Sequence, residues 1–155
     1  MEVNNQNFLI TWDKVKLNIN GELIDYPLLK IKISGAPSLV EFIRFMTKIE
    51  SFTENFKEDY ISITDFSDLD PNKVIETLIS LSSNKLVRTM TFVSNQSKIS
   101  FVVLGKDSKL TVLRKRLEDV NTTTEENAYS YNYRFIEEEA QMVGIAEEIL
   151  NRKVV

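Results

Sequence analysis

The sequence predicts an α/β protein: a two-layer sandwich with a mostly parallel sheet, an antiparallel N-terminal hairpin and its helices on one face. Two observations lead to this fold class. Alternating apolar and polar residues on both sides of Asn20-Gly21 predict two strands joined by a tight turn. From residue 38 onward, helical stretches alternate with short apolar strands in the overall order ββαβαβαβα, which favours parallel strands joined by crossover helices.

The first two strands form the predicted hairpin. The stretch 8–20 alternates at Val15, Leu17 and Ile19, which is strand periodicity. The second strand places three apolar residues on one face, Leu29, Ile31 and Ile33. The other face carries three polar residues, Lys30, Lys32 and Ser34. Residues 1–7 are polar, and we expect them to be frayed or disordered.

The first helix has a clear start signal. Ser38 follows Gly35-Ala-Pro, and Glu41 three residues later completes a capping box. Its apolar stripe is expected to face the core and consists of Leu39, Phe42, Ile43, Met46, Ile49 and Phe56. Residues 57–59 end the helix, and a third strand is predicted over 60–65.

The second helix is predicted to begin at an Asp-Pro pair. Asp70 suits the N-cap, and Pro71 suits the first helical position, where its missing N–H costs nothing. The buried stripe is expected to be Val74, Ile75, Leu78 and Ile79. The region 82–97 carries both helical spacing and strand propensity, so both structures stay open there, with helix favoured.

The C-terminal half continues the alternation. In the strand 98–104, the unbroken apolar run 101–104 predicts burial on both faces. Next come a helix over 108–120, a solvated loop over 121–127 and a strand over 129–135. The last helix, over 137–152, is expected to pack on Ala140, Val143, Ala146 and Leu150.

Composition limits the classes of function. The 155 residues suit a single domain, 1–155. The chain contains no His and no Cys, which excludes a Ser-His-Asp triad, a thiol nucleophile and a zinc hydrolase site. The net charge of −4 argues against nucleic-acid binding. With no apolar run of membrane-spanning length and no signal-peptide pattern, we expect a cytoplasmic protein without membrane insertion.

Polar residues gather where the third strand ends and the second helix begins. In α/β proteins such junctions meet ligands and partners, so we expect the contact surface to comprise Asp65, Ser67, Asp68, Asp70, Asn72 and Lys73. The three aspartates offer the oxygen ligands that hard cations prefer. Their D-x-x-D-x-D spacing lacks the glycine and the distant Glu of an EF-hand, so we expect capping and loop-organising roles, with no metal and no cofactor.

Aromatic residues form a second candidate. Trp12 with Tyr129, Tyr131 and Tyr133 could flank a ligand pocket, or these residues could cover the core and the sheet edges. The sequence leaves both alternatives open.

The order of elements and three short stretches resemble the STAS domain, named for sulfate transporters and anti-sigma-factor antagonists, and especially its small stand-alone bacterial relatives. The stretches are 60–69, 98–105 and 133–140, and the likeness spans roughly residues 10–152. Phosphorylation-switched members of that family carry Ser or Thr at the start of the second helix. Here Asp68-Leu-Asp-Pro-Asn72 has no hydroxyl there, so the switch is either missing or moved to Ser67, as a possible phosphorylation site.

The resemblance implies a non-enzymatic regulatory or scaffold protein that binds a protein partner through the loop and helix start after the third strand. The alternative is a small-molecule or lipid carrier with an apolar pocket between sheet and helices. An enzyme is the third hypothesis, and the missing His and Cys disfavour it. The sequence identifies neither the partner nor the oligomeric state, and a homodimer is one state that it allows.

Overall fold

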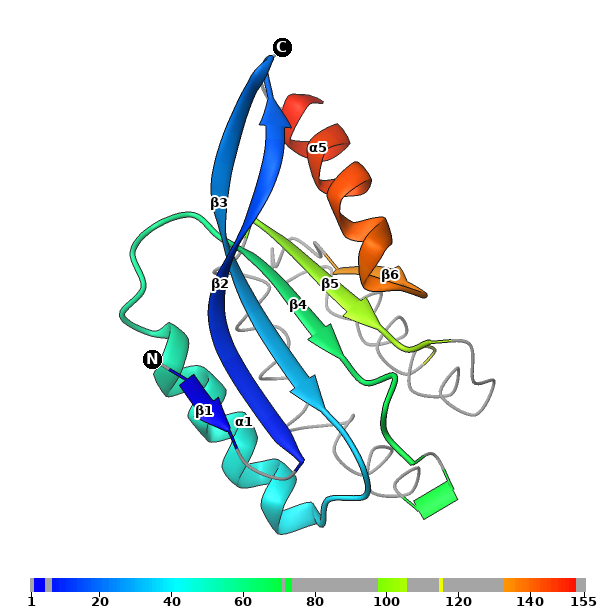
Figure 1. The fold of residues 1–155 in the computed structure, drawn as a ribbon. Coiled ribbons are helices and arrows are strands. Elements are labelled where there is room, and N and C mark those ends of the chain that lie inside the picture. Colours follow the sequence, from blue (N-terminus) through cyan, green and yellow to red (C-terminus); the bar gives the residue numbers. More distant parts are fainter. Residues whose placement is uncertain are drawn as a thin grey trace, which may run out of the picture.

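One mixed sheet forms the centre of the protein (Figure 1). The computed structural model describes residues 2–4, 7–70, 72–73, 98–105, 115 and 133–152. In this part of the chain the six strands lie in the order β1-β2-β3-β4-β5-β6. Their bounds are β1 Glu2–Asn4, β2 Phe8–Ile19, β3 Glu22–Ile33, β4 Ile61–Asp65, β5 Ile99–Val103 and β6 Tyr133–Ile136.

The strand directions agree with the predicted α/β class. The β1–β2 and β2–β3 pairs are antiparallel, whereas β3–β4, β4–β5 and β5–β6 are parallel. The strands predicted near residues 29–34, 60–65 and 98–104 are therefore neighbours in one mostly parallel part of the sheet. Burial of all five residues of β5 also confirms the strand predicted to be covered on both faces.

The predicted hairpin is present, and it is longer than the alternation indicated. β2 and β3 pair from Phe8↔Ile33 to Ile19↔Glu22. The turn places Asn20 at φ 55° and Gly21 at φ 83°, the left-handed conformations that a two-residue hairpin turn requires. Residues 1–7 were expected to be frayed, but Glu2–Asn4 form β1 by pairing with β2, because the edge of β2 offers free backbone donors and acceptors.

The last helix, α5 (Met142–Arg152), supports the far end of this hairpin. Leu17 of β2 is fully buried in the same cluster as Met142 and Ala146. At the hairpin end, the Asn18 amide donates to Glu147 Oε2 (2.6 Å) and the Asn20 amide to Asn151 Oδ1 (2.8 Å). Asn151 Nδ2 in turn donates to the Asn18 carbonyl (3.1 Å). These bonds attach the C-terminal helix to the N-terminal hairpin.

The two long helices described, α1 (Leu39–Thr53) and α5, cover opposite faces of the sheet. Alternate residues of a strand point to opposite faces. In β3, Leu29 and Ile31 pack with α1, whereas Leu28 packs with α5, which lies in front of the sheet in Figure 1. The prediction of a two-layer sandwich with helices on one face was therefore wrong for these helices. The physical reason is that the sheet carries apolar side chains on both faces, so both faces need a cover.

The start of α1 confirms the predicted capping box. Ser38 Oγ accepts a hydrogen bond from the Glu41 amide (3.2 Å), and Glu41 Oε1 accepts one from the Ser38 amide (3.0 Å). The pKa of the Glu41 carboxyl is lowered mainly by the hydrogen bond from the Ser38 backbone amide. The hydrogen bond with the Ser38 side chain lowers it further. The cap fixes the entry of the chain into α1 directly after β3.

The buried stripe of α1 is rotated relative to the prediction. Phe42, Met46 and Ile49 are buried as expected, but Leu39 and Ile43 stay 43% and 41% exposed. Phe45, which was not in the predicted stripe, is buried and stacks on Phe8 at a ring-centroid distance of 4.3 Å. Phe45 thus takes the place in the core that the prediction gave to Ile43.

The C-terminal elements differ in detail from the prediction. Between β6 and α5 lies a short 3-10 helix, η3 (Glu139–Gln141), on which Ala140 is exposed and not part of the core. Met142, Ala146 and Leu150 supply the buried face of α5. The predictions for 74–97, 108–120, 121–127 and 129–132 lie outside the described residues, except for Lys115, which is helical and exposed.

Candidate functional site

The loop that follows β4 is held tightly by its backbone. The Phe66 amide donates to the Val103 carbonyl of β5 (2.8 Å). Gly35, just after β3, donates to the Asp68 carbonyl (3.0 Å) and accepts from the Asp70 amide (2.8 Å). Phe66 is fully buried and Leu69 is 4% exposed, so both side chains lie in the core. The loop is thus fixed to the ends of β3 and β5, while the side chains between its anchors face solvent.

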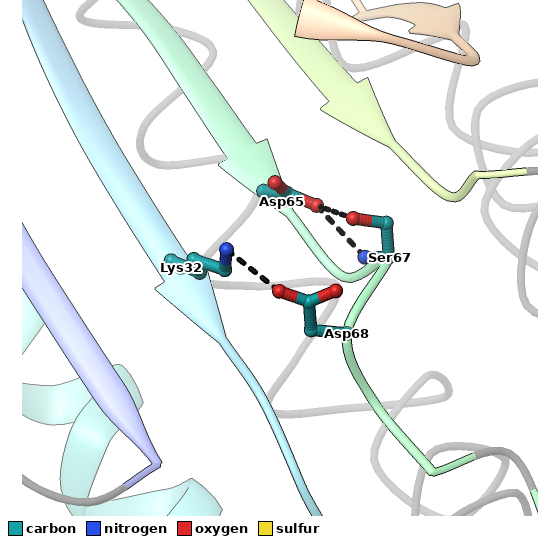
Figure 2. Close-up of polar contacts among 4 residues, drawn as sticks. All are labelled: Lys32, Asp65, Ser67 and Asp68. Carbon is teal, nitrogen blue, oxygen red and sulfur yellow. Dashed lines mark hydrogen bonds and ion pairs between the residues drawn. The ribbon is translucent and has the colours of Figure 1, made fainter.

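Asp65 and Ser67 form a local turn at the end of β4 (Figure 2). Asp65 Oδ1 accepts hydrogen bonds from the Ser67 amide (2.8 Å) and from the Ser67 hydroxyl (2.5 Å). A short acidic side chain that accepts from the amide two residues on is the usual organiser of such a turn. The loop-organising role expected for Asp65 is therefore confirmed.

Asp68 lies on the other side of this turn and faces a lysine from β3. Its Oδ2 is 2.7 Å from Lys32 Nζ, with 59% of the Asp68 side chain exposed (Figure 2). The hydrogen bond with Asp68 raises the pKa of Lys32, and the charges of Asp68, Asp65 and Glu139 act in the same direction against desolvation. The interaction of protonated Lys32 with Asp68 therefore stabilises the folded protein. Its contribution is fully present below the ordinary lysine pKa and is lost as the pH rises through the raised pKa of Lys32.

Asp70 occupies the predicted capping position. Its Oδ1 accepts from the Asn72 amide (3.1 Å), and its carbonyl accepts from the Lys73 amide (3.2 Å). Asn72 and Lys73 are helical and exposed, and Lys73 Nζ lies 4.0 Å from Asp70 Oδ2. The predicted helix start is therefore present in the residues described here.

The structure brings the predicted site residues onto one junction but gives them separate partners. Asp65 accepts hydrogen bonds from Ser67, the Asp68 carboxylate pairs with Lys32, and Asp70 caps the helix start. Within the described part of the chain, no group of three acidic side chains is arranged to hold a metal ion. Sequence reasoning missed Lys32, although the parallel register places it directly beside Asp65.

Trp12, predicted either to flank a ligand pocket or to cover the core, packs against other aromatic side chains of the core. Its ring stacks on Phe56 at 4.0 Å and on Phe52 at 6.1 Å, and meets Tyr60 edge-on at 5.1 Å. Tyr133 lies on β6, from which β3, β4 and β5 separate Trp12 on β2, so these two residues do not flank one pocket. Tyr129 and Tyr131 lie outside the described residues.

Tyr60 carries a buried hydroxyl that makes no hydrogen bond in the described part of the structure. Burial raises the pKa of this phenol well above its ordinary value. Because an unpaired buried hydroxyl is costly, Tyr60→Phe is expected to raise the free energy of unfolding by about 1–3 kcal/mol. Urea denaturation checks this, with Tyr26→Phe, on the half-buried β3 tyrosine, as the near-neutral control. A destabilised Tyr60→Phe variant would show that the hydroxyl has a partner.

Comparisons of the chain with protein-family models, with curated proteins and with solved structures returned no match. Among the helices in the described ranges, none has the length and apolar character needed to cross a lipid bilayer.

Proposed function

We propose that the protein is a non-enzymatic regulatory or scaffold protein that binds a protein partner through the β4 junction, defined as Asp65, Ser67, Asp68, Asp70, Asn72 and Lys73. In this proposal it acts in the bacterial cytoplasm and shares the STAS-like fold that its sequence resembles. One observation carries the proposal: the junction combines an anchored backbone with exposed polar side chains.

The anchoring supports recognition by a protein. Buried Phe66 and Leu69 and the bonds to Gly35 and Val103 hold the loop before any partner arrives. A preorganised loop loses little conformational entropy on binding, so more of the contact energy appears as affinity. Ser67, Asp68, Asn72 and Lys73 are exposed along this segment and offer hydroxyl, carboxylate, amide and ammonium groups.

A carrier with an apolar pocket finds less support in the described residues. In the described residues, hydrophobic clusters of mostly large side chains pack between the sheet and α1 and between the sheet and α5. A hollow among the described residues is small, and four of the seven residues that line it are charged. An apolar ligand would need a cavity lined mainly by hydrophobic side chains.

The proposal is tested with a charge reversal at Asp68. Partners captured from bacterial cytoplasm with the wild-type protein are purified, and their affinity for Asp68→Lys is measured by calorimetry. We expect the Kd to rise at least tenfold, which is a loss of about 1.4 kcal/mol of binding free energy, because the charge of an exposed residue in the junction is reversed. The surface pair with Lys32 contributes only about 0–1 kcal/mol, so thermal stability should fall slightly.

The matched control is Glu58→Lys, an exposed residue of the loop before β4, at the opposite end of that strand. It makes the same change in charge and should leave the Kd unaltered. Equal affinity of wild type and Asp68→Lys for the captured partner would place the functional surface elsewhere.

A further inference from the structure

A small hollow lies on the α5 side of the sheet, beyond the N-terminal end of that helix. Its volume is about 260 Å³, and its walls include Leu9, Lys30, Lys32, Ile63, Asp65 and Glu139. Ligand pockets commonly measure about 300–1,000 Å³, so this hollow suits a ligand smaller than drug-sized molecules. It borders the β4 junction at Asp65 but opens onto the sheet face.

The strand register explains why these side chains converge. Leu9, Lys32 and Asp65 are direct neighbours across β2, β3 and β4. In the adjacent row, Lys30 lies beside Ile63. All five point to one face, since residues two apart along a strand share a face. Glu139 of η3 closes the row from outside the sheet, with its carboxylate 3.0 Å from Lys30 Nζ.

The charged groups of the hollow retain unused hydrogen-bonding capacity. Lys30 pairs with Glu139 and Lys32 with Asp68, but each ammonium group has three N–H donors. Asp65 receives both Ser67 hydrogen bonds on Oδ1, so within the described structure its Oδ2 accepts none. The hollow therefore offers donors on one wall and a carboxylate acceptor on the next.

The charge balance favours a ligand that carries both signs. Along the walls, Lys30 and Lys32 are matched in number by Asp65 and Glu139, and the carboxylate of Asp68 adds a further negative charge 2.7 Å from Lys32 Nζ. A ligand with only a negative charge would be attracted by the lysines but repelled by the carboxylates. A ligand with only a positive charge would be attracted by the carboxylates but repelled by the lysines. A zwitterion satisfies both sets at once, and Leu9 and Ile63 supply apolar contact for an aliphatic group.

We propose that this hollow binds a free aliphatic α-amino acid. The carboxylate of the ligand lies against the ammonium groups of Lys30 and Lys32, its ammonium group donates to Asp65 Oδ2, and its side chain packs on Leu9 and Ile63. The site adjoins the β4 junction proposed for partner recognition, and the two share Asp65.

The test compares three probes that share one aliphatic group: L-leucine, 4-methylpentanoate, which lacks the amine, and 3-methylbutylamine, which lacks the carboxylate. Binding to the full-length protein is followed by NMR titration. We expect L-leucine to bind in the millimolar range or tighter, and each analogue to bind at least tenfold more weakly. No binding of L-leucine at millimolar concentration, or equal binding of the three probes, would overturn the proposal.

Three variants locate the site. Asp65→Asn keeps an oxygen for the Ser67 amide but removes the charge, and it should weaken L-leucine binding at least tenfold. Lys30→Met should do the same, whereas Lys48→Met, on an exposed lysine of α1, should have no effect. Unchanged binding by a folded Asp65→Asn protein would contradict the assignment. The calorimetry with Asp68→Lys involves no small molecule, so the two proposals fail independently.

Discussion

Replacing Phe66 by alanine is expected to lower the free energy of unfolding by about 3–5 kcal/mol, as for other buried phenylalanines. Phe66 is fully buried in the α1-side cluster, and its amide donates to the Val103 carbonyl of β5. The loss combines the apolar surface returned to water with the cavity left in that cluster. Urea denaturation measures it as a lower midpoint with an unchanged slope.

The same substitution should also weaken partner binding, because the loop loses the side chain that holds its first residue in the core. The control is Glu58→Ala in the loop before β4, an exposed residue outside the junction that should change stability by no more than about 0.5 kcal/mol and leave partner binding unaltered. A loss below about 1 kcal/mol for Phe66→Ala would mean that the loop is not anchored by the core.

Gly35→Ala is expected to cost about 1–3 kcal/mol for its backbone conformation alone. Gly35 has φ +69°, in the left-handed region that side chains disfavour, and an added Cβ would lie 2.6 Å from Asn7 Oδ1. Moving this residue also disturbs its hydrogen bonds with Asp68 and Asp70. We therefore expect a lower midpoint in urea and faster hydrogen exchange at the Asp70 amide.

Gly21→Ala serves as the control that separates the cost of the backbone conformation from the cost of the contact with Asn7. Gly21 has a similar φ of +83°, but nothing lies within 4 Å of an added Cβ. The excess cost at Gly35 then measures the contact with Asn7 and the coupling to the loop. Equal costs at the two glycines, with unchanged exchange at Asp70, would show that Gly35 does not support the β4 junction.

Local signals predicted the features that depend on a few neighbouring residues. The hairpin turn at Asn20-Gly21 and the caps at Ser38 and Asp70 follow from side chains within three positions of each backbone group. Likewise, the apolar run 101–104 predicted a strand covered on both faces because each face of a strand is read directly from alternate residues.

Other features required contacts between distant parts of the chain. Which helix covers which face cannot be read from an apolar stripe, since α1 and α5 would each fit either side of a sheet that is apolar on both. The rotation of α1 depends on the stacking of Phe45 on Phe8, more than thirty residues earlier. The pairing of β1 depends on a free strand edge that sequence periodicity does not record.

The candidate site divides in the same way. The sequence by itself determined that Asp65, Ser67, Asp68 and Asp70 lie at a strand–helix junction, because strand and helix signals meet there. Only the tertiary structure decided that Lys32 pairs with Asp68 and that Lys30 and Glu139 border the same hollow as Asp65. The physical reason is register: the alignment of β3 with β4 is set by packing across the whole sheet, and no local pattern specifies it.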